Sequence, residues 1–289
     1  MNSVRRPVAA AMAGAFALLV GSGAASAQTT VDVENIYSNV GVIMVWRVDD
    51  SEKPVQLLAF ASGTLIRSRV VVTAGHFTAP VKAMGGLPPM TRQFASFSPM
   101  DARDPSTWIP VVAQVTHPSM PHCPPPLGCD PTDEILVAPL EPGIADVGLV
   151  FLEHAPADIK PAMLAAPGTL NRSEGANTTI VGYGIVSPPD KGLAVNAWPW
   201  DGKRRIRTSA VRKIVDETWA LWAIPSYVCF GDSGGGIFVA APSGRAADVL
   251  VANVSDGGQD CRRHNNNNRL DTGAIQKWID DAVRAQEER

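Results

Sequence analysis

The chain has 289 residues, of which 25 are Lys or Arg and 28 are Asp or Glu, so its formal net charge is −3. This balance excludes the strongly basic surface with which proteins bind nucleic acid or acidic membranes. The 25 glycines and 24 prolines together exceed their usual share of about 12%, which indicates many turns between short elements.

The first 27 residues carry the pattern of a secretory signal peptide. Arg5 and Arg6 form a basic start, Val8–Val20 is an apolar run, and the small residues at 25–27 fit a cleavage site. An uncleaved membrane anchor is the alternative, but the apolar core is shorter than the ~20 residues that span a bilayer. The pattern predicts a mature chain, residues 28–289, that is secreted or periplasmic and has no stable membrane association.

Short apolar stretches rich in β-branched residues follow, separated by turn-forming clusters. Because no stretch in the middle of the chain has a convincing helical period, the pattern predicts an all-β sandwich or barrel. The run Asn265–Asn268 is interpreted as an exposed loop. The predicted strands are Val40–Trp46, Leu57–Ile66, Val70–Thr73, Val111–Val115, Val147–Leu152, Thr178–Val181, Gly236–Ala240 and Val249–Val254.

The end of the chain has a helical pattern. Apolar residues recur on one helical face from Ile275 to Val283, and Asp271 or Thr272 precedes them as an N-cap. The spacing predicts a C-terminal helix over residues 272–286.

Four cysteines in an exported chain predict disulfides, for which three connectivities exist. Cys123 and Cys129 close a small proline-rich loop, which favours local pairing and leaves Cys229 with Cys261. A metal site on His122 and the first two cysteines is the alternative, but the spacing matches no zinc pattern. The sequence therefore predicts no metal and no cofactor.

A glycine-rich run, Gly231–Gly236, surrounds Ser233. Glycines allow a tight turn that exposes the serine and directs the N–H groups of Gly231 and Ser233 toward one point. A serine hydroxyl needs a neighbouring base, and the base needs a partner that fixes its tautomer. A plain hairpin turn is the alternative interpretation of this run.

Two other positions supply those partners. His76 follows a β-branched run and the small residues Ala74 and Gly75, and Asp146 directly precedes an apolar strand. Taken alone, each has a structural explanation, as a satisfied core histidine or a turn aspartate. Together with Ser233 they indicate nucleophilic catalysis.

With these motifs the sequence resembles the chymotrypsin/trypsin family of serine peptidases, in its bacterial secreted branch. Thr73–His76 matches Thr-Ala-small-His, Asp146–Leu149 matches Asp-(Ile/Val)-(Ala/Gly)-Leu, and Gly231–Gly235 matches Gly-Asp-Ser-Gly-Gly. Weaker similarities include Ser62–Ile66 before the histidine strand and Gly182–Gly184. The resemblance spans nearly all of residues 28–289.

The resemblance implies two six-stranded antiparallel β-barrels and a C-terminal α-helix. The first barrel would occupy about residues 37–155, the second about 160–270. Catalysis would use Ser233 as nucleophile, His76 as base and Asp146 as orienting acid, with the Gly231 and Ser233 N–H groups as oxyanion hole. The substrate would be a protein or peptide.

The substrate-binding residues that the resemblance implies are Tyr227, Ser255 and Gly257. Tyr227 stands at the base of the primary specificity pocket, where an acidic residue would select Lys or Arg, so cleavage after basic residues is not expected. The chain also lacks an Arg/Lys-Ile-Val-Gly-Gly activation sequence. The residue before the nucleophile, Asp232, therefore needs a partner other than a newly freed N-terminus.

Two other functions are also considered from the sequence alone. Gly231–Gly235 also fits Gly-x-Ser-x-Gly of α/β-hydrolase esterases, but that fold needs a helix after the serine and the order serine, acid, histidine. Here Ile237–Val239 is a predicted strand, and only His264 follows Ser233. The second rival is a catalytically silent binding module on the same fold.

Overall fold

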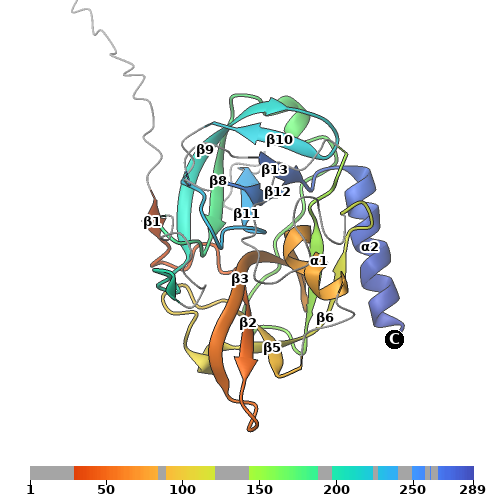
Figure 1. Ribbon diagram of the computed structural model, residues 1–289. Helices are drawn as coiled ribbons and strands as arrows, with labels where there is room; N and C mark the ends of the chain where they lie inside the picture. The colour runs from red at the N-terminus through yellow and green to blue at the C-terminus, as the bar shows by residue number, and fades with distance from the viewer. Residues whose placement is uncertain are drawn as a thin grey trace, which may run out of the picture.

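The computed structural model describes residues 29–83, 89–120, 143–187, 197–223, 227–239, 249–257, 261 and 266–289 (Figure 1). Most of the described elements are short strands, which form two closed antiparallel barrels, and a helix ends the chain. The fold class predicted from the sequence is therefore confirmed.

The first barrel, at the bottom of Figure 1, closes in the order β2-β3-β4-β7-β6-β5. Its interior is lined by β-branched and aliphatic side chains such as Ile43, Leu65 and Val150, which are almost fully buried. The six strands are β2 (Val40–Val48), β3 (Pro54–Arg67), β4 (Val70–Thr73), β5 (Thr91–Ser96), β6 (Ile109–Thr116) and β7 (Gly148–Leu152).

The second barrel, at the top of Figure 1, follows the order β9-β10-β13-β12-β11-β8 and closes through pairing of β8 with β9. A short N-terminal strand, β1 (Thr30–Val31), adds to the outer edge of β9. The six barrel strands are β8 (Asn177–Gly182), β9 (Arg205–Ile214), β10 (Trp219–Trp222), β11 (Gly236–Val239), β12 (Val249–Asp256) and β13 (Asn266–Arg269).

Helices are few among the described residues. Two single-turn 3₁₀ helices, η1 (Pro105–Thr107) and η2 (Leu170–Arg172), lie in connections, and α1 (Gly75–Ala83) directly follows β4. The sequence pattern did not predict α1, because its nine residues are too few to show a helical period. His76 therefore lies in the first turn of a helix rather than at a free strand end.

The C-terminal helix α2 (Gly273–Glu287) agrees with the predicted one. The Thr272 hydroxyl caps it by accepting a hydrogen bond from the Ile275 N–H. Ile275, Ile279 and Val283 are buried in the core, and the Trp278 ring packs on His117 at a centroid distance of 4.9 Å. The helix therefore begins beside the second barrel and packs against the first.

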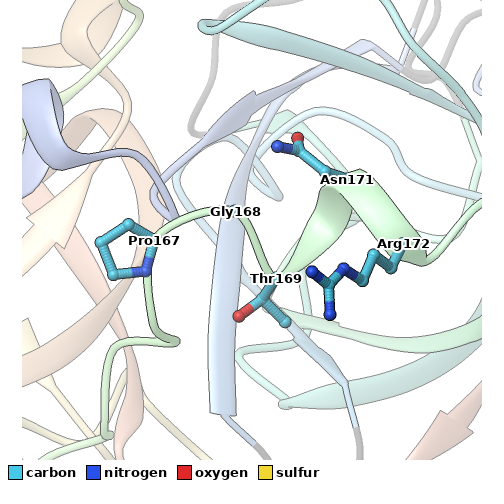
Figure 2. Close-up of a pocket in the computed structure, with 5 residues that line it drawn as sticks. All are labelled: Pro167, Gly168, Thr169, Asn171 and Arg172. Atoms are coloured by element: carbon cyan, nitrogen blue, oxygen red, sulfur yellow. The ribbon is translucent and has the colours of Figure 1, made fainter.

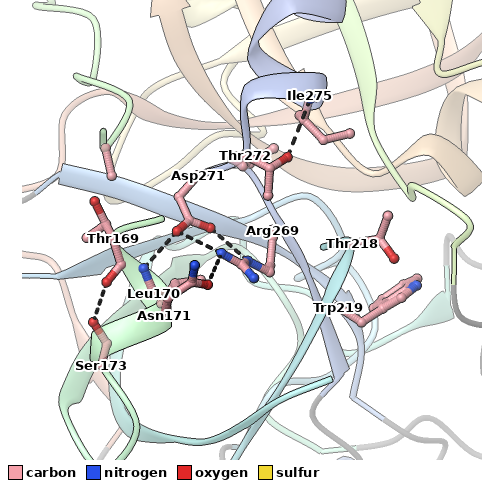
Figure 3. A network of polar contacts seen from close by, with 12 residues as sticks. Thr169, Leu170, Asn171, Ser173, Thr218, Trp219, Arg269, Asp271, Thr272 and Ile275 are labelled. Carbon is pink, nitrogen blue, oxygen red and sulfur yellow. Dashed lines mark hydrogen bonds and ion pairs between the residues drawn. The ribbon is translucent and has the colours of Figure 1, made fainter. Parts of the chain in front are cut away.

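A buried polar network anchors the start of α2 (Figure 3). The Asp271 carboxylate accepts hydrogen bonds from the Leu170 N–H at 2.7 Å and from Arg269 Nε at 2.9 Å. Arg269 also donates to Asn171 Oδ1 at 2.8 Å. These bonds join β13, η2 and α2, so the second barrel and the terminal helix form one unit.

One cluster of buried hydrophobic residues spans the two barrels. Tyr37 packs on Phe238, with ring centroids 5.0 Å apart, and Phe60 stacks on Trp200 at 4.5 Å. Buried Arg204 pairs with Asp32 and donates to backbone carbonyls of the first barrel. The structure thus fixes the two barrels relative to each other.

Among the described residues, none of the helices has the length and apolar character needed to cross a membrane.

Candidate active site

His76 and Asp146 form the best-defined part of the candidate site. The Asp146 carboxylate accepts a hydrogen bond from the His76 backbone N–H at 2.7 Å and lies 2.8 Å from Nδ1 of the same residue. The Asp146 side chain is fully buried, whereas the imidazole is 11% exposed. Because a carboxylate only accepts hydrogen bonds, Nδ1 carries the proton and Nε2 is free to act as a base.

Residues of the second barrel hold Asp146 in place. The Asp146 N–H donates to Asn268 Oδ1 at 2.9 Å, and Asn253 Nδ2 donates to the Asp146 carbonyl at 3.1 Å. The Ser255 hydroxyl donates to the Asp146 carboxylate. The base and its partner therefore come from the first barrel, and β12 and β13 fix their position.

The asparagine run at 265–268 was expected to be an exposed loop, and for the described residues that expectation was wrong. Residues 266–268 lie in β13, and Asn267 and Asn268 are fully buried. A buried amide is tolerated when it has hydrogen-bond partners, which Asn268 finds in Asp146 and Arg269. Polarity alone does not distinguish such a position from a solvated loop.

The charges around the imidazole favour its protonated form. Burial disfavours the charged ring, but the Asp146 carboxylate, its hydrogen bond and the charge of Asp256 outweigh burial and raise the pKa of His76 above 6.5. Burial disfavours the charged form of Asp146 as well. The charge and hydrogen bonds of His76, together with the Ser255 hydroxyl, nevertheless keep the pKa of Asp146 below its usual value.

Ser233 lies in a tight loop whose glycines allow its shape. Gly231 and Gly234 have φ of 88° and 79°, the left-handed region that other residues rarely adopt. A Cβ built on Gly234 would lie 2.3 Å from Thr73 Oγ1 and 2.6 Å from the Ala74 nitrogen. The loop that carries Ser233 therefore packs against the segment that leads into His76.

The backbone of this loop leaves two N–H groups available. The N–H groups of Asp232, Gly234 and Gly235 donate to carbonyls at 3.0, 2.7 and 2.8 Å. Within the described part of the chain, those of Gly231 and Ser233 donate to no protein acceptor. The half-buried Ser233 thus lies beside two unused donors in a loop that is otherwise hydrogen-bonded.

Ser62 on β3 joins the loop to both barrels, a role that the sequence did not reveal. Its N–H donates to the Ser233 carbonyl at 2.8 Å, and its hydroxyl donates to the Gly231 carbonyl at 2.7 Å. The same hydroxyl accepts a hydrogen bond from the Tyr183 N–H at 2.8 Å. The signal that could have found it is its place in the Ser62–Ile66 run, which precedes the histidine strand.

The three expected substrate-binding residues lie in two neighbouring segments. Tyr227 is 37% exposed and has φ of 56°. A Cβ built on Gly257 would lie 2.5 Å from the Val228 carbonyl, so the segments at 227–228 and 255–257 pack together. The Ser255 hydroxyl donates to Asp146 and its N–H donates to Asn267 Oδ1 at 3.4 Å, so the side chain of Ser255 supports the acid.

A disulfide joins Cys229 to Cys261, as the sequence predicts. The bond ties the segment before Ser233 to the one after β12. Cys123 and Cys129, the other predicted pair, lie outside the described residues, as does the metal alternative that included His122. Among the residues that are described, no three His, Cys, Asp or Glu side chains gather as a metal site.

A hollow of about 440 Å³ lies beside η2 and is lined by residues 167–169, Asn171 and Arg172 (Figure 2). Its lining includes none of the candidate site residues. Asn171, one of the lining residues, accepts a hydrogen bond from Arg269. The hollow therefore lies beside the polar network at the start of α2, and no residue of the candidate site lines it.

The fold is similar to that of mouse neuropsin, a structure described as a serine protease expressed in the limbic system of mouse brain. The similarity has a TM-score of 0.54 at 14% sequence identity and covers 89% of this chain and 99% of that chain. At this identity the likeness shows a shared chymotrypsin-like fold. No protein-family model and no curated protein sequence matches the chain.

Proposed function

We propose that this chain is a secreted or periplasmic serine endopeptidase, with Ser233 as nucleophile, His76 as general base and Asp146 as orienting acid. The observation that carries the proposal is the double hydrogen bond from His76 to the buried Asp146, at 2.7 and 2.8 Å, beside the loop of Ser233. A purely structural histidine does not need a fully buried carboxylate on one nitrogen and an exposed edge on the other.

The acylation step uses the groups in this order. Ser233 Oγ attacks the carbonyl carbon of the scissile bond while its proton passes to His76 Nε2, and the carbonyl π electrons move onto oxygen. The N–H groups of Gly231 and Ser233 stabilise this oxyanion. When the carbonyl re-forms, the C–N bond breaks, and the proton on His76 passes to the leaving amine.

Deacylation repeats the sequence with water. His76 takes a proton from the water as its oxygen attacks the acyl carbon, and the ester bond to Ser233 then breaks. The serine recovers its proton, and a carboxylic acid is released. Neither half-reaction needs a metal or an organic cofactor.

The substrate is proposed to be a protein or peptide bound along the segments at 227–228 and 255–257. Tyr227 would occupy the base of the primary pocket and supplies no negative charge for a Lys or Arg side chain. Export would place the Cys229–Cys261 disulfide in an oxidising compartment, where such bonds persist. The substrate assignment depends on the proposed catalytic arrangement, whereas export is inferred from the signal-peptide pattern of the first 27 residues.

A fluorophosphonate probe tests the proposal, because it reacts with serines that a neighbouring base activates. We expect the unaltered chain to be labelled and Ser233→Ala and His76→Ala to remain unlabelled while their melting temperatures stay close to the unaltered one. Ser106→Ala and His154→Ala, at exposed positions, serve as matched controls and should label normally. A peptide library would then define the cleavage preference.

A folded but unlabelled chain would contradict the proposal and favour a catalytically silent binding module on the same fold. Hydrolysis of short esters without any cleavage of proteins or peptides would instead favour an esterase.

A further inference from the structure

Asp232 directly precedes Ser233 in the chain. Its side chain is fully buried, and its carboxylate ties three segments together. Oδ1 accepts hydrogen bonds from the Gly184 N–H at 2.8 Å and from Arg207 Nη1 at 3.0 Å, and Oδ2 accepts one from the Cys229 N–H at 2.9 Å. The end of β8, strand β9 and the Ser233 loop therefore meet at this carboxylate.

The space around the carboxylate is shaped for it. A Cβ built on Gly182 would lie 2.4 Å from Asp232 Oδ1, and one on Gly184 would lie 2.3 Å from the carboxyl carbon. Real Cβ atoms do not approach that closely, so both positions require glycine. The two glycines flank Tyr183 in the sequence. Because neither has a side chain, the Asp232 carboxylate can pack directly against the backbone at both positions.

Arg207 supplies the charge that this burial requires. It projects from β9, where it lies opposite Ile180 of β8, and its side chain is fully buried. A buried carboxylate without a counter-charge is strongly disfavoured, and removing one member of a buried ion pair leaves the other charge uncompensated in the core. Among the described residues, Arg207 donates to no acceptor through Nε and Nη2, so Asp232 is its described acceptor.

The neighbouring strands add no competing charge. Strands β8, β10 and β11 contain no Asp, Glu, Lys, Arg or His. Nearby Arg205 pairs with Asp201, and Arg204 pairs with Asp32. The titratable group between Gly182 and Gly184 is Tyr183, and burial raises its pKa to about 12.

The charged ends of the other barrel strands have partners of their own. On β13, Arg269 pairs with Asp271. At the end of β12, the charge of Asp256 acts on His76. Cys229, in the loop itself, is in a disulfide and does not titrate.

We propose that Arg207 is a positioning residue of the active site. Its positive charge holds Asp232 in the core, and this fixes the backbone of residues 231–233, in which the N–H groups of Gly231 and Ser233 would bind the oxyanion. A guanidinium keeps its proton throughout the pH range in which proteins remain folded. The site is therefore assembled by an internal, permanent charge and stays assembled at alkaline pH. This inference rests on the proposed function.

The test replaces the permanent charge by one that titrates. In Arg207→Lys the ammonium can still pair with Asp232 at neutral pH, but a lysine loses its proton near pH 10.4, or lower when it is buried. We expect this variant to be labelled by the fluorophosphonate at pH 7 within about tenfold of the unaltered rate. Its labelling should then fall by at least about tenfold between pH 8 and 10.

The matched control is Arg205→Lys, which makes the same change two residues away, in the pair with Asp201. It and the unaltered chain should keep their labelling rates from pH 8 to 10, below the range in which Tyr183 titrates. Amide hydrogen exchange of residues 229–236 gives a second readout that needs no catalysis. At pH 10 the loop should exchange faster in Arg207→Lys than in Arg205→Lys.

Parallel pH profiles and equal loop exchange for Arg207→Lys and Arg205→Lys would overturn the inference. If the unaltered chain is not labelled, the proposed function fails, and the exchange experiment still tests Arg207.

If Arg207→Lys does not fold, Arg207→Met combined with Asp232→Asn removes both charges, a change that buried pairs often tolerate. That folded double variant should be labelled at least about tenfold more slowly at every pH, because only neutral hydrogen bonds remain to hold the loop. Labelling at the unaltered rate would overturn the inference.

Discussion

Asp146 binds both the backbone and the ring of His76, through hydrogen bonds of 2.7 Å to its N–H and 2.8 Å to Nδ1. The backbone bond fixes where the carboxylate stands relative to the start of α1. The ring bond then fixes the tautomer and the orientation of the imidazole. Because Asn253, Ser255 and Asn268 of the second barrel hold Asp146, the base is oriented only when both barrels are packed together.

Asp146→Asn should leave the fold intact and nearly abolish reactivity. The amide can donate a hydrogen bond to Nδ1, which moves the ring proton to Nε2 and removes the base. In triads of this kind the loss is about 10⁴-fold in rate, and we expect a similar loss in the rate of fluorophosphonate labelling. Asp158→Asn, at an exposed position with positive φ that asparagine tolerates, should label normally. A loss below tenfold in Asp146→Asn would contradict the assigned role.

The rate of labelling should rise with pH through a midpoint above 6.5. Only the neutral imidazole accepts a proton, and the pKa of His76 is raised because Asp146 and Asp256 outweigh its burial. Asp256→Asn removes one of the raising charges, so its midpoint should move to lower pH. Labelling rates between pH 5 and 8 measure this shift. Glu34→Gln, which removes an exposed negative charge, should keep the midpoint, and an unshifted Asp256→Asn profile would exclude the effect of Asp256.

The strand pattern predicted an all-β fold, and the motifs that carry the family resemblance supplied the two barrels and the three catalytic candidates, because all of these features depend on local patterns. Strands such as Val70–Thr73 are short β-branched runs, and the motifs around His76, Asp146 and Ser233 are contiguous. Helix α1 was missed because its Thr, Pro and Val residues are weak helix formers and tertiary packing determines its conformation. Patterns of neighbouring residues in the sequence therefore predicted the short strands and the contiguous motifs.

The residues that support the site were not predictable, because their partners lie far away in the chain. Asn268 is 122 residues from Asp146, and Ser62 is 169 residues from Gly231. Arg207 stands in a strand that contains several cations, and nothing in its local sequence distinguishes it from paired surface arginines. Only the closure of the second barrel brings it to Asp232.

Gly234→Ala should destabilise the protein far more than the same change at Gly143. Both glycines have positive φ, 79° and 88°, so both substitutions carry the left-handed penalty of about 1–2 kcal/mol. A Cβ on Gly234 would also overlap Ser62, Thr73 and Ala74, whereas one on Gly143 would meet no atom of the described residues within 4 Å. Urea denaturation should therefore show a loss of several kcal/mol for Gly234→Ala and about 1–2 kcal/mol for Gly143→Ala. Equal losses would mean that the loop moves away from β4 without cost.

Removal of the Cys229–Cys261 disulfide should weaken both the fold and the site. The bond closes a loop with a sequence separation of 32 residues, for which the entropy of the unfolded chain predicts about 3–4 kcal/mol of stabilisation. The Cys229 N–H also donates to Asp232, so a freer Cys229 loosens the oxyanion loop. Urea denaturation and labelling of the Cys229→Ala, Cys261→Ala double variant measure the two effects.

The matched control for that disulfide is the Cys123→Ala, Cys129→Ala double variant. If these residues form the predicted local bond, they close a much shorter loop, and its removal should cost about 2 kcal/mol. Neither cysteine belongs to the Ser233 loop, so labelling should be unchanged. Unchanged labelling after loss of the Cys229–Cys261 bond would show that Asp232 stays in place without the disulfide, and that the disulfide stabilises the barrel without shaping the site.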